Sequence, residues 1–136
     1  MDFPLDQINQ GQKGTLAEAL GIVITLAKPG HLEATMPVDH RTIQPMGLLH
    51  GGASVALAET LGSMGSFLLV KDLNQAPVGL EINANHLRSA SQGFVFGKAI
   101  IIHQGKRTHV WSIEIVDEQQ RLLCTSRLTV MITELK

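Results

Sequence analysis

Cysteine is almost absent from this sequence: Cys124 is the only one among 136 residues. An intramolecular disulfide is therefore excluded, and a reducing compartment is compatible with the composition. Cys124 falls at an apolar position of a strand pattern, so we expect a core residue without chemistry of its own. An excess of one charge sign is missing too, because the formal net charge is −1. The chain thus has no overall electrostatic reason to bind nucleic acid or a membrane surface.

Targeting and membrane-spanning signals are also lacking. Residues 1–6 are acidic and contain no basic region followed by an apolar stretch, so we expect no secretory signal here. The longest apolar runs are interrupted by Glu59, glycines and serines, and none is typical of a transmembrane helix. By elimination we expect a cytoplasmic protein. The length and the 44% hydrophobic content predict one domain over residues 1–136, with a core that needs no disulfide or metal.

Signatures of metal, cofactor and serine-hydrolase chemistry are missing. Six histidines are present, but no two have the i, i+4 spacing of helical zinc ligands, and a second cysteine is lacking. No glycine motif for phosphate or dinucleotide binding occurs, so we expect neither a metal nor a cofactor. Ser54 lies in a segment one residue short of Gly-x-Ser-x-Gly. Because the alternating strand–helix pattern of an α/β-hydrolase is absent, we interpret Ser54 as a packing residue.

The pattern that is present predicts one long helix among short strands. Thr15 to Glu18 has the form of a capping box, which indicates a short helix near residues 15–20. Residues 22–27 and 32–38 are typical of a β-hairpin with a Pro-Gly turn. Further strands are predicted over residues 77–88, 94–103, 108–116 and from about residue 122 to residue 132.

A nearly continuous apolar run from Gly51 to Val70 predicts a buried helix. Each glycine within it costs about 1 kcal/mol relative to alanine, which indicates that another backbone lies very close. A hairpin, a helix and then a four-strand meander predict an α+β fold, with a curled antiparallel sheet of about six strands wrapped around the helix. Trp111, Ile113 and Leu87 are assigned to the opposite, exposed face of the sheet, which indicates oligomerisation.

The apolar helix carries a single ionisable side chain, Glu59. A carboxylate in such a helix is costly unless it is used or hydrogen-bonded, so we interpret Glu59 as a pocket carboxylate. The helix start at Gly51 offers free N–H groups and a positive dipole end, both suited to an oxyanion. Glu59 could attack a carbonyl carbon or activate a water.

Spacing then decides how these two groups can cooperate. Gly51 and Glu59 are separated by about 12 Å along a helix, too far to act on one carbonyl. Glu59 of one subunit must therefore meet Gly51 of another, for example through two antiparallel helices across a two-fold axis. The catalytic hypothesis predicts an obligate homodimer.

Two basic turns have the residue types that bind phosphate. Composition alone favours ordinary solvated charge at both of them. Their residues are His86, Leu87, Arg88 and Ser89 in the first turn, and His103, Gln104, Gly105, Lys106, Arg107 and Thr108 in the second.

Two motifs flank and enter the predicted central helix, residues 44–52 (QPMGLLHGG) and residues 58–63 (AETLGS). On these motifs, and over nearly the whole chain beyond about residue 15, the sequence resembles the hotdog-fold acyl-CoA thioesterases of the PaaI-like branch. Within that branch the motifs are most similar to two groups. One is the 1,4-dihydroxy-2-naphthoyl-CoA thioesterases of menaquinone biosynthesis, and the other is the proofreading thioesterases of enterobactin synthesis. Members are typically homotetramers built from two hotdog dimers.

The resemblance implies a role for each matched residue. Glu59 would be the nucleophile or general base, and the Gly51 N–H would polarise the thioester carbonyl. Gln44 and His50 would assist around the thioester and the leaving thiolate. Ser63 would help to place the attacking water.

The resemblance also implies binding roles. Met64 would line the acyl pocket, and Gly79 together with both basic turns would contact coenzyme A. Residues 81–86 are similar to the menaquinone enzyme, whereas residues 60–64 are similar to the enterobactin enzyme. We expect an aroyl-CoA resembling 1,4-dihydroxy-2-naphthoyl-CoA.

Other functions stay open at this point. One alternative is a proofreading thioesterase acting on an aryl or acyl carrier protein. Another is a hotdog hydratase or dehydratase of enoyl thioesters, which would need His50 and Glu59 to cooperate across a dimer. An acyl-CoA sensor would normally need an attached DNA-binding segment, and none is visible in the sequence.

Overall fold

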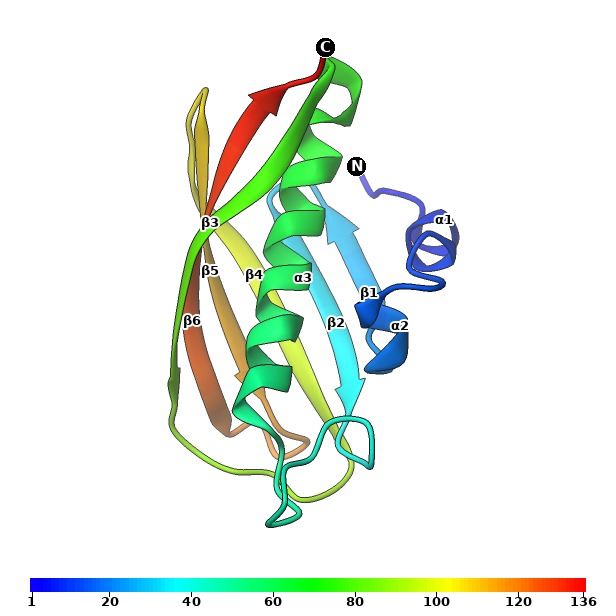
Figure 1. Ribbon diagram of the computed structural model, residues 1–136, viewed down its shortest axis with the longest axis vertical. Helices are drawn as coiled ribbons and strands as arrows, with labels where there is room; N and C mark the ends of the chain where they lie inside the picture. The colour runs from blue at the N-terminus through cyan, green and yellow to red at the C-terminus, as the bar shows by residue number, and fades with distance from the viewer.

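The computed structural model describes residues 1–136, and Figure 1 shows the arrangement of its elements around one long helix. In chain order these are α1 (Leu5–Gln10), α2 (Leu16–Ala19), β1 (Val23–Lys28), β2 (His31–Pro37), α3 (Gly51–Val70), the short 3-10 helix η1 (Lys71–Leu73), β3 (Gln75–His86), β4 (Phe94–Gln104), β5 (Thr108–Val116) and β6 (Leu122–Glu134). The predicted hairpin, central helix and later strands are all confirmed.

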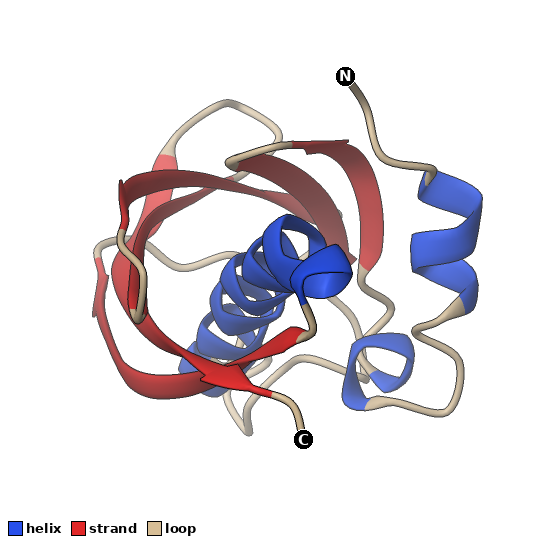
Figure 2. Cartoon of the chain, turned by 90° about the horizontal axis from the view of Figure 1, so that it is seen from above, coloured by secondary structure: helices blue, strands red, loops and turns tan.

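The six strands form one antiparallel sheet in the order β1-β2-β4-β5-β6-β3. Figure 2 looks along α3 and shows the sheet curling around it, as predicted. The expected meander is wrong in one respect, because β3 pairs with β6 and not with β4. The chain after β3 crosses the lower end of the molecule to reach β4 (Figure 1). Local patterning identifies a strand but does not identify its neighbour.

The central helix is apolar enough, together with η1, to span a membrane by length and composition. More than half of its most apolar stretch is buried inside the structure, however, where the sheet surrounds it. Leu57, Ala58 and Leu61 have no exposed surface. The apolar composition of α3 therefore reflects its place in the core.

Glycines within α3 allow large side chains of the sheet to approach its backbone. A β-carbon added at Gly62 would lie 2.5 Å from a methyl group of Leu128. A β-carbon at Gly65 would meet the indole ring of Trp111. The prediction of a close approach was thus right, but the prediction that backbone makes it was wrong: the neighbours are side chains of β5 and β6.

The concave face of the sheet, which contacts α3, carries the core. Trp111 and Ile113 have no exposed surface, so their assignment to the exposed face was wrong. The two faces of an amphipathic strand cannot be told apart from alternation alone. Leu87, which follows β3, is 58% exposed as expected. Cys124 is buried in the core, also as expected, and burial raises the pKa of its thiol.

A β-bulge in β3 changes which residues face the helix. Gly79 pairs with Val130 and Glu81 pairs with Thr129, so Leu80 is an extra residue without its own partner. A simple alternation of inward and outward side chains along residues 77–88 therefore breaks at Leu80. As a result Gly79 faces α3, on the same face of the sheet as its partner Val130.

The first residues of the chain form structure that the sequence pattern did not predict. Helix α1 lies beside the β1 edge of the sheet, with α2 next to it (Figure 2). Helix α2 confirms the short helix near residues 15–20, but the capping box does not form as predicted. The Thr15 hydroxyl donates to the Gln12 carbonyl, and Glu18 accepts the N–H of Gly14.

A buried polar network links α3 to β5. The Trp111 Nε1–H donates to Ser66 Oγ at 2.8 Å, and Ser66 Oγ lies 2.8 Å from His109 Nδ1. His109 is only 2% exposed. Burial, and secondarily the nearby His103, lower the pKa of His109 below its ordinary value of 6.5. The folded protein therefore favours neutral His109.

Acid should destabilise the protein through this histidine. As the pH falls below about 6.5, the unfolded chain binds a proton that the folded chain resists, so the free energy of unfolding decreases. Above that pH both states are neutral at this position. Replacing His109 with glutamine should remove this contribution, which is at most ~1.4 kcal/mol per pH unit for one proton. Urea unfolding of both proteins across a pH series measures the difference. Equal pH slopes would contradict the prediction.

Candidate active site

The start of α3 presents a backbone donor that the chain leaves unpaired. His50 precedes the helix in an extended conformation, and its Nδ1 accepts the Gly52 N–H at 2.8 Å. Because Nδ1 is an acceptor, the neutral ring carries its proton on Nε2. The Gly51 N–H donates to no atom of the chain. It is therefore available, at the positive end of the helix dipole, for an oxygen that gains negative charge.

Gln44 lies in a tight turn that aims its side-chain amide. The Gly47 N–H donates to the Gln44 carbonyl at 2.8 Å, and Gly47 has a φ of +80°, which glycine adopts without strain. Gln44 Oε1 accepts the Met46 N–H. With its oxygen used in this way, the Gln44 amide nitrogen remains as a donor for a ligand.

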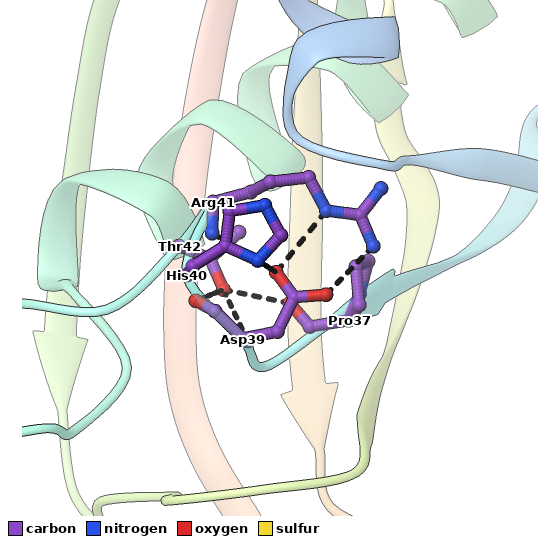
Figure 3. Close-up of polar contacts among 5 residues, drawn as sticks. All are labelled: Pro37, Asp39, His40, Arg41 and Thr42. Carbon is purple, nitrogen blue, oxygen red and sulfur yellow. Dashed lines mark hydrogen bonds and ion pairs between the residues drawn. The ribbon is translucent and has the colours of Figure 1, made fainter.

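The loop before α3 is fixed by a cluster of polar contacts around Asp39 (Figure 3). Thr42 Oγ1 donates to the Pro37 carbonyl at 2.7 Å, and the Thr42 carbonyl accepts the His50 N–H at 2.8 Å. Arg41 binds the Asp39 carboxylate through Nη2 at 2.7 Å and Nε at 3.1 Å. The hydrogen bonds from the Arg41 side chain and backbone lower the pKa of Asp39 to about 2. This cluster holds the chain that leads into His50 and the helix start.

A cavity of about 470 Å³ joins the helix start to the end of β3. Its lining includes residues that the sequence predicts for two separate roles, the stabilisation of an oxyanion and the binding of phosphate. They are Gln44 and Gly51 from the proposed oxyanion end, and His86, Leu87, Arg88 and Ser89 from the first basic turn. A β-carbon added at Gly51 would lie 3.1 Å from His86 Nε2, so these two parts of the cavity are in close contact.

Glu59 lies two turns further along α3, against the middle of β3. Its side chain is half-buried and forms no hydrogen bond within the chain. A β-carbon added at Gly79 would lie 2.6 Å from Glu59 Oε2. Glycine at position 79 therefore gives the carboxylate room beside the strand. The structure places Gly79 at Glu59, away from the first basic turn.

The candidate catalytic groups form two separate half-sites within one chain. Helix α3 is continuous from Gly51 to Val70, so Gly51 and Glu59 are about 12 Å apart along its axis. Ser63 and Met64 follow Glu59 on the next helical turn and are half-buried. The structure thus brings together Gln44, Gly51 and the first basic turn, but not the Glu59 half-site.

The second basic turn lies at the other end of the molecule. It connects β4 to β5 beside the C-terminal part of α3, where His109 contacts Ser66. In Figure 1 this turn is the gold hairpin at the top, far from the loops that surround the start of α3. One chain therefore does not bring the two basic turns to a common ligand.

Sequence reasoning missed part of the cavity lining. Ser54 is buried, as expected for a packing residue, but it also lines the cavity. Its position one helical turn after Gly51 was a signal that could have revealed this. Leu48, Leu49 and Leu123 line the cavity too, and Leu123 reaches it from the last strand without any local sequence signal.

Solved structures of the same architecture identify the fold class. The chain is similar to thioesterase PA1618 from Pseudomonas aeruginosa, solved as a glutamine-to-alanine variant, with a TM-score of 0.94 and 47% identity over 98% of this chain and 96% of that chain. It is similar to thioesterase HI1161 from Haemophilus influenzae, with a TM-score of 0.93 and 47% identity over 98% of this chain and 92% of that chain. The hotdog fold predicted from the sequence is confirmed.

Family membership follows from the sequence comparisons. Residues 46–124 match the family model described as the thioesterase superfamily. The chain is 54% identical over 128 residues to the proofreading thioesterase EntH of Cronobacter sakazakii, covering 94% of this chain and 93% of that protein. This chain belongs to the thioesterase superfamily.

Proposed function

We propose that the protein hydrolyses the thioester of an aroyl- or acyl-CoA at a site shared by two subunits. Membership of the thioesterase superfamily supports thioester hydrolysis. One observation supports the shared site. The Gly51 N–H and the Glu59 carboxylate both lack a hydrogen-bond partner within the chain, and one continuous helix holds them apart. Each half-site has one of the two groups that acyl transfer needs.

The open edge of the sheet supports a partner beside Glu59. Strand β3 pairs only with β6, so its other side has unpaired backbone groups. Val78 and Leu80 on this strand are 47% and 54% exposed, close to the Glu59 half-site. A second copy related by a two-fold axis would set two α3 helices antiparallel, with each Gly51 near the other subunit's Glu59. The family resemblance extends this homodimer to a homotetramer.

Hydrolysis at such a site follows from the chemistry of the two groups. The Gly51 N–H binds the carbonyl oxygen and stabilises the negative charge that develops there. In the general-base route, Glu59 takes a proton from a water, whose oxygen bonds to the carbonyl carbon while the carbon–sulfur bond breaks. The proton then returns to the leaving thiolate. In the nucleophilic route, a Glu59 oxygen bonds to the carbonyl carbon while the carbon–sulfur bond breaks and the thiolate leaves. Water then cleaves the resulting anhydride, which restores the Glu59 carboxylate, releases the free acid and supplies the proton that the thiolate takes up.

Residues around the helix start would assist these steps. The Gln44 amide and the His50 Nε2–H are donors near the Gly51 N–H, suited to the thioester and the departing thiolate. Ser63, one turn after Glu59, is placed to hold the attacking water, and Met64 beside it would line the acyl pocket.

Coenzyme A would bind across the same interface. The first basic turn shares a cavity with Gly51, and its Arg88 provides a fixed positive charge. In an antiparallel dimer, the second basic turn of one subunit approaches the helix start of the other. Lys106 and Arg107 would then join Arg88 around one set of phosphates. The separation of the two turns in one chain is thus consistent with a shared site.

The acyl group and its carrier define the substrate more narrowly. An aroyl-CoA similar to 1,4-dihydroxy-2-naphthoyl-CoA is the substrate that residues 81–86 favour by resemblance. The 54% identity to a proofreading thioesterase supports an aryl or acyl carrier protein as a comparable alternative. Both substrates have the same phosphopantetheine thioester, so the catalytic groups serve either one.

A substrate panel tests the proposal. Release of free thiol should be measured from benzoyl-CoA, 1,4-dihydroxy-2-naphthoyl-CoA, hexanoyl-CoA and a 2,3-dihydroxybenzoyl carrier protein. We expect hydrolysis of at least one CoA thioester, with the ratio between CoA and carrier-protein substrates deciding the physiological donor class. Crotonyl-CoA should give free crotonate and no hydrated thioester. Absence of hydrolysis across the panel, or hydration of crotonyl-CoA, would contradict the proposal.

A further inference from the structure

A second cavity, of about 400 Å³, lies between α1 and the C-terminal half of α3. We call it the distal groove. This volume is within the range of small-molecule sites. Its exposed lining surface is mostly apolar and comes chiefly from Ile8, Met64, Phe67 and Leu68, with the polar side chains of Gln12 and Lys71 beside them. Phe67 remains 44% exposed, so part of a large apolar ring in the groove has no partner within the chain.

The outer wall of the distal groove is held by β1 and not by α3. Asn9 of α1 donates through Nδ2 to the Ile24 carbonyl and accepts the Ile24 N–H through Oδ1, both at 2.9 Å. The Phe3 N–H donates to the Ala27 carbonyl at 2.8 Å. The N-terminal segment that contains Phe3 and Asn9 therefore covers the edge of the sheet at β1, and it forms hydrogen bonds with β1 that a further strand would otherwise form. These bonds fix α1 to the sheet and so hold the outer wall of the groove in place.

One face of α3 leads from the Glu59 half-site to the distal groove. Glu59, Ser63 and Phe67 are successive members of one i, i+4 ridge, on which neighbouring side chains touch. Phe67 lies about 12 Å from Glu59 along the helix axis. Met64 lies between them and lines the groove as well. A flexible chain that begins at Glu59 can thus follow the ridge past Ser63 into the groove.

We propose that the distal groove binds the far end of an alkyl acyl group whose thioester lies at Glu59. This proposal rests on the proposed function, and it defines one substrate class, medium- and long-chain acyl thioesters. An aromatic ring attached directly to the carbonyl reaches Ser63 and Met64, at the near end of the groove, but not Phe67. An unbranched alkyl chain extends further and covers the exposed part of Phe67. Apolar surface of the alkyl chain and of the Phe67 ring is thereby removed from water. The groove therefore favours long chains without a requirement for any new polar contact.

Filling the groove from α1 tests the proposal. Replacing Gly11 with phenylalanine adds a ring to the groove, and the Gly11 φ of −67° is accessible to any residue. Gln7 also lines the groove, and its replacement with tryptophan is a second filling variant. Gln10 is exposed, does not line the groove, and gives the matched control Gln10→Phe. Thermal unfolding and sedimentation equilibrium should accompany every assay.

Two readouts separate this proposal from the proposed function. The first is the ratio of kcat/KM for dodecanoyl-CoA to that for benzoyl-CoA, which should fall at least about tenfold in both filling variants and stay unchanged in Gln10→Phe. The second is binding of S-dodecyl-CoA, a thioether that cannot be hydrolysed, measured by calorimetry. Its affinity should fall about tenfold relative to S-benzyl-CoA, even if no thioester proved to be a substrate.

Two outcomes would overturn the proposal. One is an unchanged chain-length ratio and unchanged S-dodecyl-CoA affinity in folded filling variants. The other is a change of oligomeric state with equal loss for all substrates, because a second copy of the chain would then occupy the groove.

Discussion

Replacing Glu59 with alanine should lower kcat/KM for the best CoA thioester by about a hundredfold to ten-thousandfold, the contribution of a positioned general base. The half-buried carboxylate forms no hydrogen bond within its own chain and lies against Gly79. Its removal therefore leaves no partner unsatisfied, and the free energy of unfolding should change little. Initial rates of thiol release measure the effect, with urea unfolding as the control for stability.

Two further observations make the Glu59 result specific. Replacing Glu59 with glutamine keeps the shape and removes the charge, so its loss of activity should be as large as that of the alanine variant. Rates near those of the wild type in either variant would exclude Glu59 from catalysis. In a single turnover in ¹⁸O-labelled water, ¹⁸O in the Glu59 carboxylate indicates the nucleophilic route with water attacking the Glu59 carbonyl of the anhydride. ¹⁸O in the released acid alone excludes that attack.

Replacing Gly51 with proline should lower kcat by about a hundredfold to a thousandfold, the loss typical of one oxyanion donor. Proline removes the N–H that the chain leaves unpaired, but it suits the first position of a helix. His50, with φ −69° and ψ 130°, already has the extended conformation that a residue before proline prefers. The helix should therefore still form.

The matched control for this change is Gly51→Ala. Both variants place a β-carbon about 3.1 Å from His86 Nε2, but only proline removes the donor. The alanine variant should therefore lose much less activity than the proline variant. Equal losses would mean that crowding of His86, and not the missing N–H, reduces the rate.

Mixed dimers can then locate the two groups in different subunits. A dimer with one Glu59→Ala subunit and one Gly51→Pro subunit has one site with both changes and one intact site. After random subunit exchange, about a quarter of the wild-type sites should be restored. Activity no higher than the sum of the two inactive parents would contradict a site shared between subunits. Sedimentation equilibrium of the parents confirms that both still assemble.

Much of this protein could be predicted from local patterns. The helix bounds at Gly51 and Val70 were predictable because a loop punctuated by proline and glycine changes there into a nearly continuous apolar run. Glu59 was recognisable as unusual because it is the only ionisable residue in that run. The distance between Gly51 and Glu59 along the helix also follows from the sequence, since the rise per residue of a helix is constant. These properties depend on residues that are neighbours in the chain.

Other features depend on contacts between distant residues, and only the tertiary structure decided them. The pairing of β3 with β6 and the bulge at Leu80 determine that Gly79 lies against Glu59. Alternation along a strand repeats every two residues but does not say which face is buried, so the place of Trp111 in the core was not predictable. The same holds for α1, which the hydrogen bonds of Asn9 to β1 hold in place. Local order follows from backbone geometry and side-chain periodicity, whereas the two half-sites and the distal groove arise where the curled sheet brings remote segments against one helix.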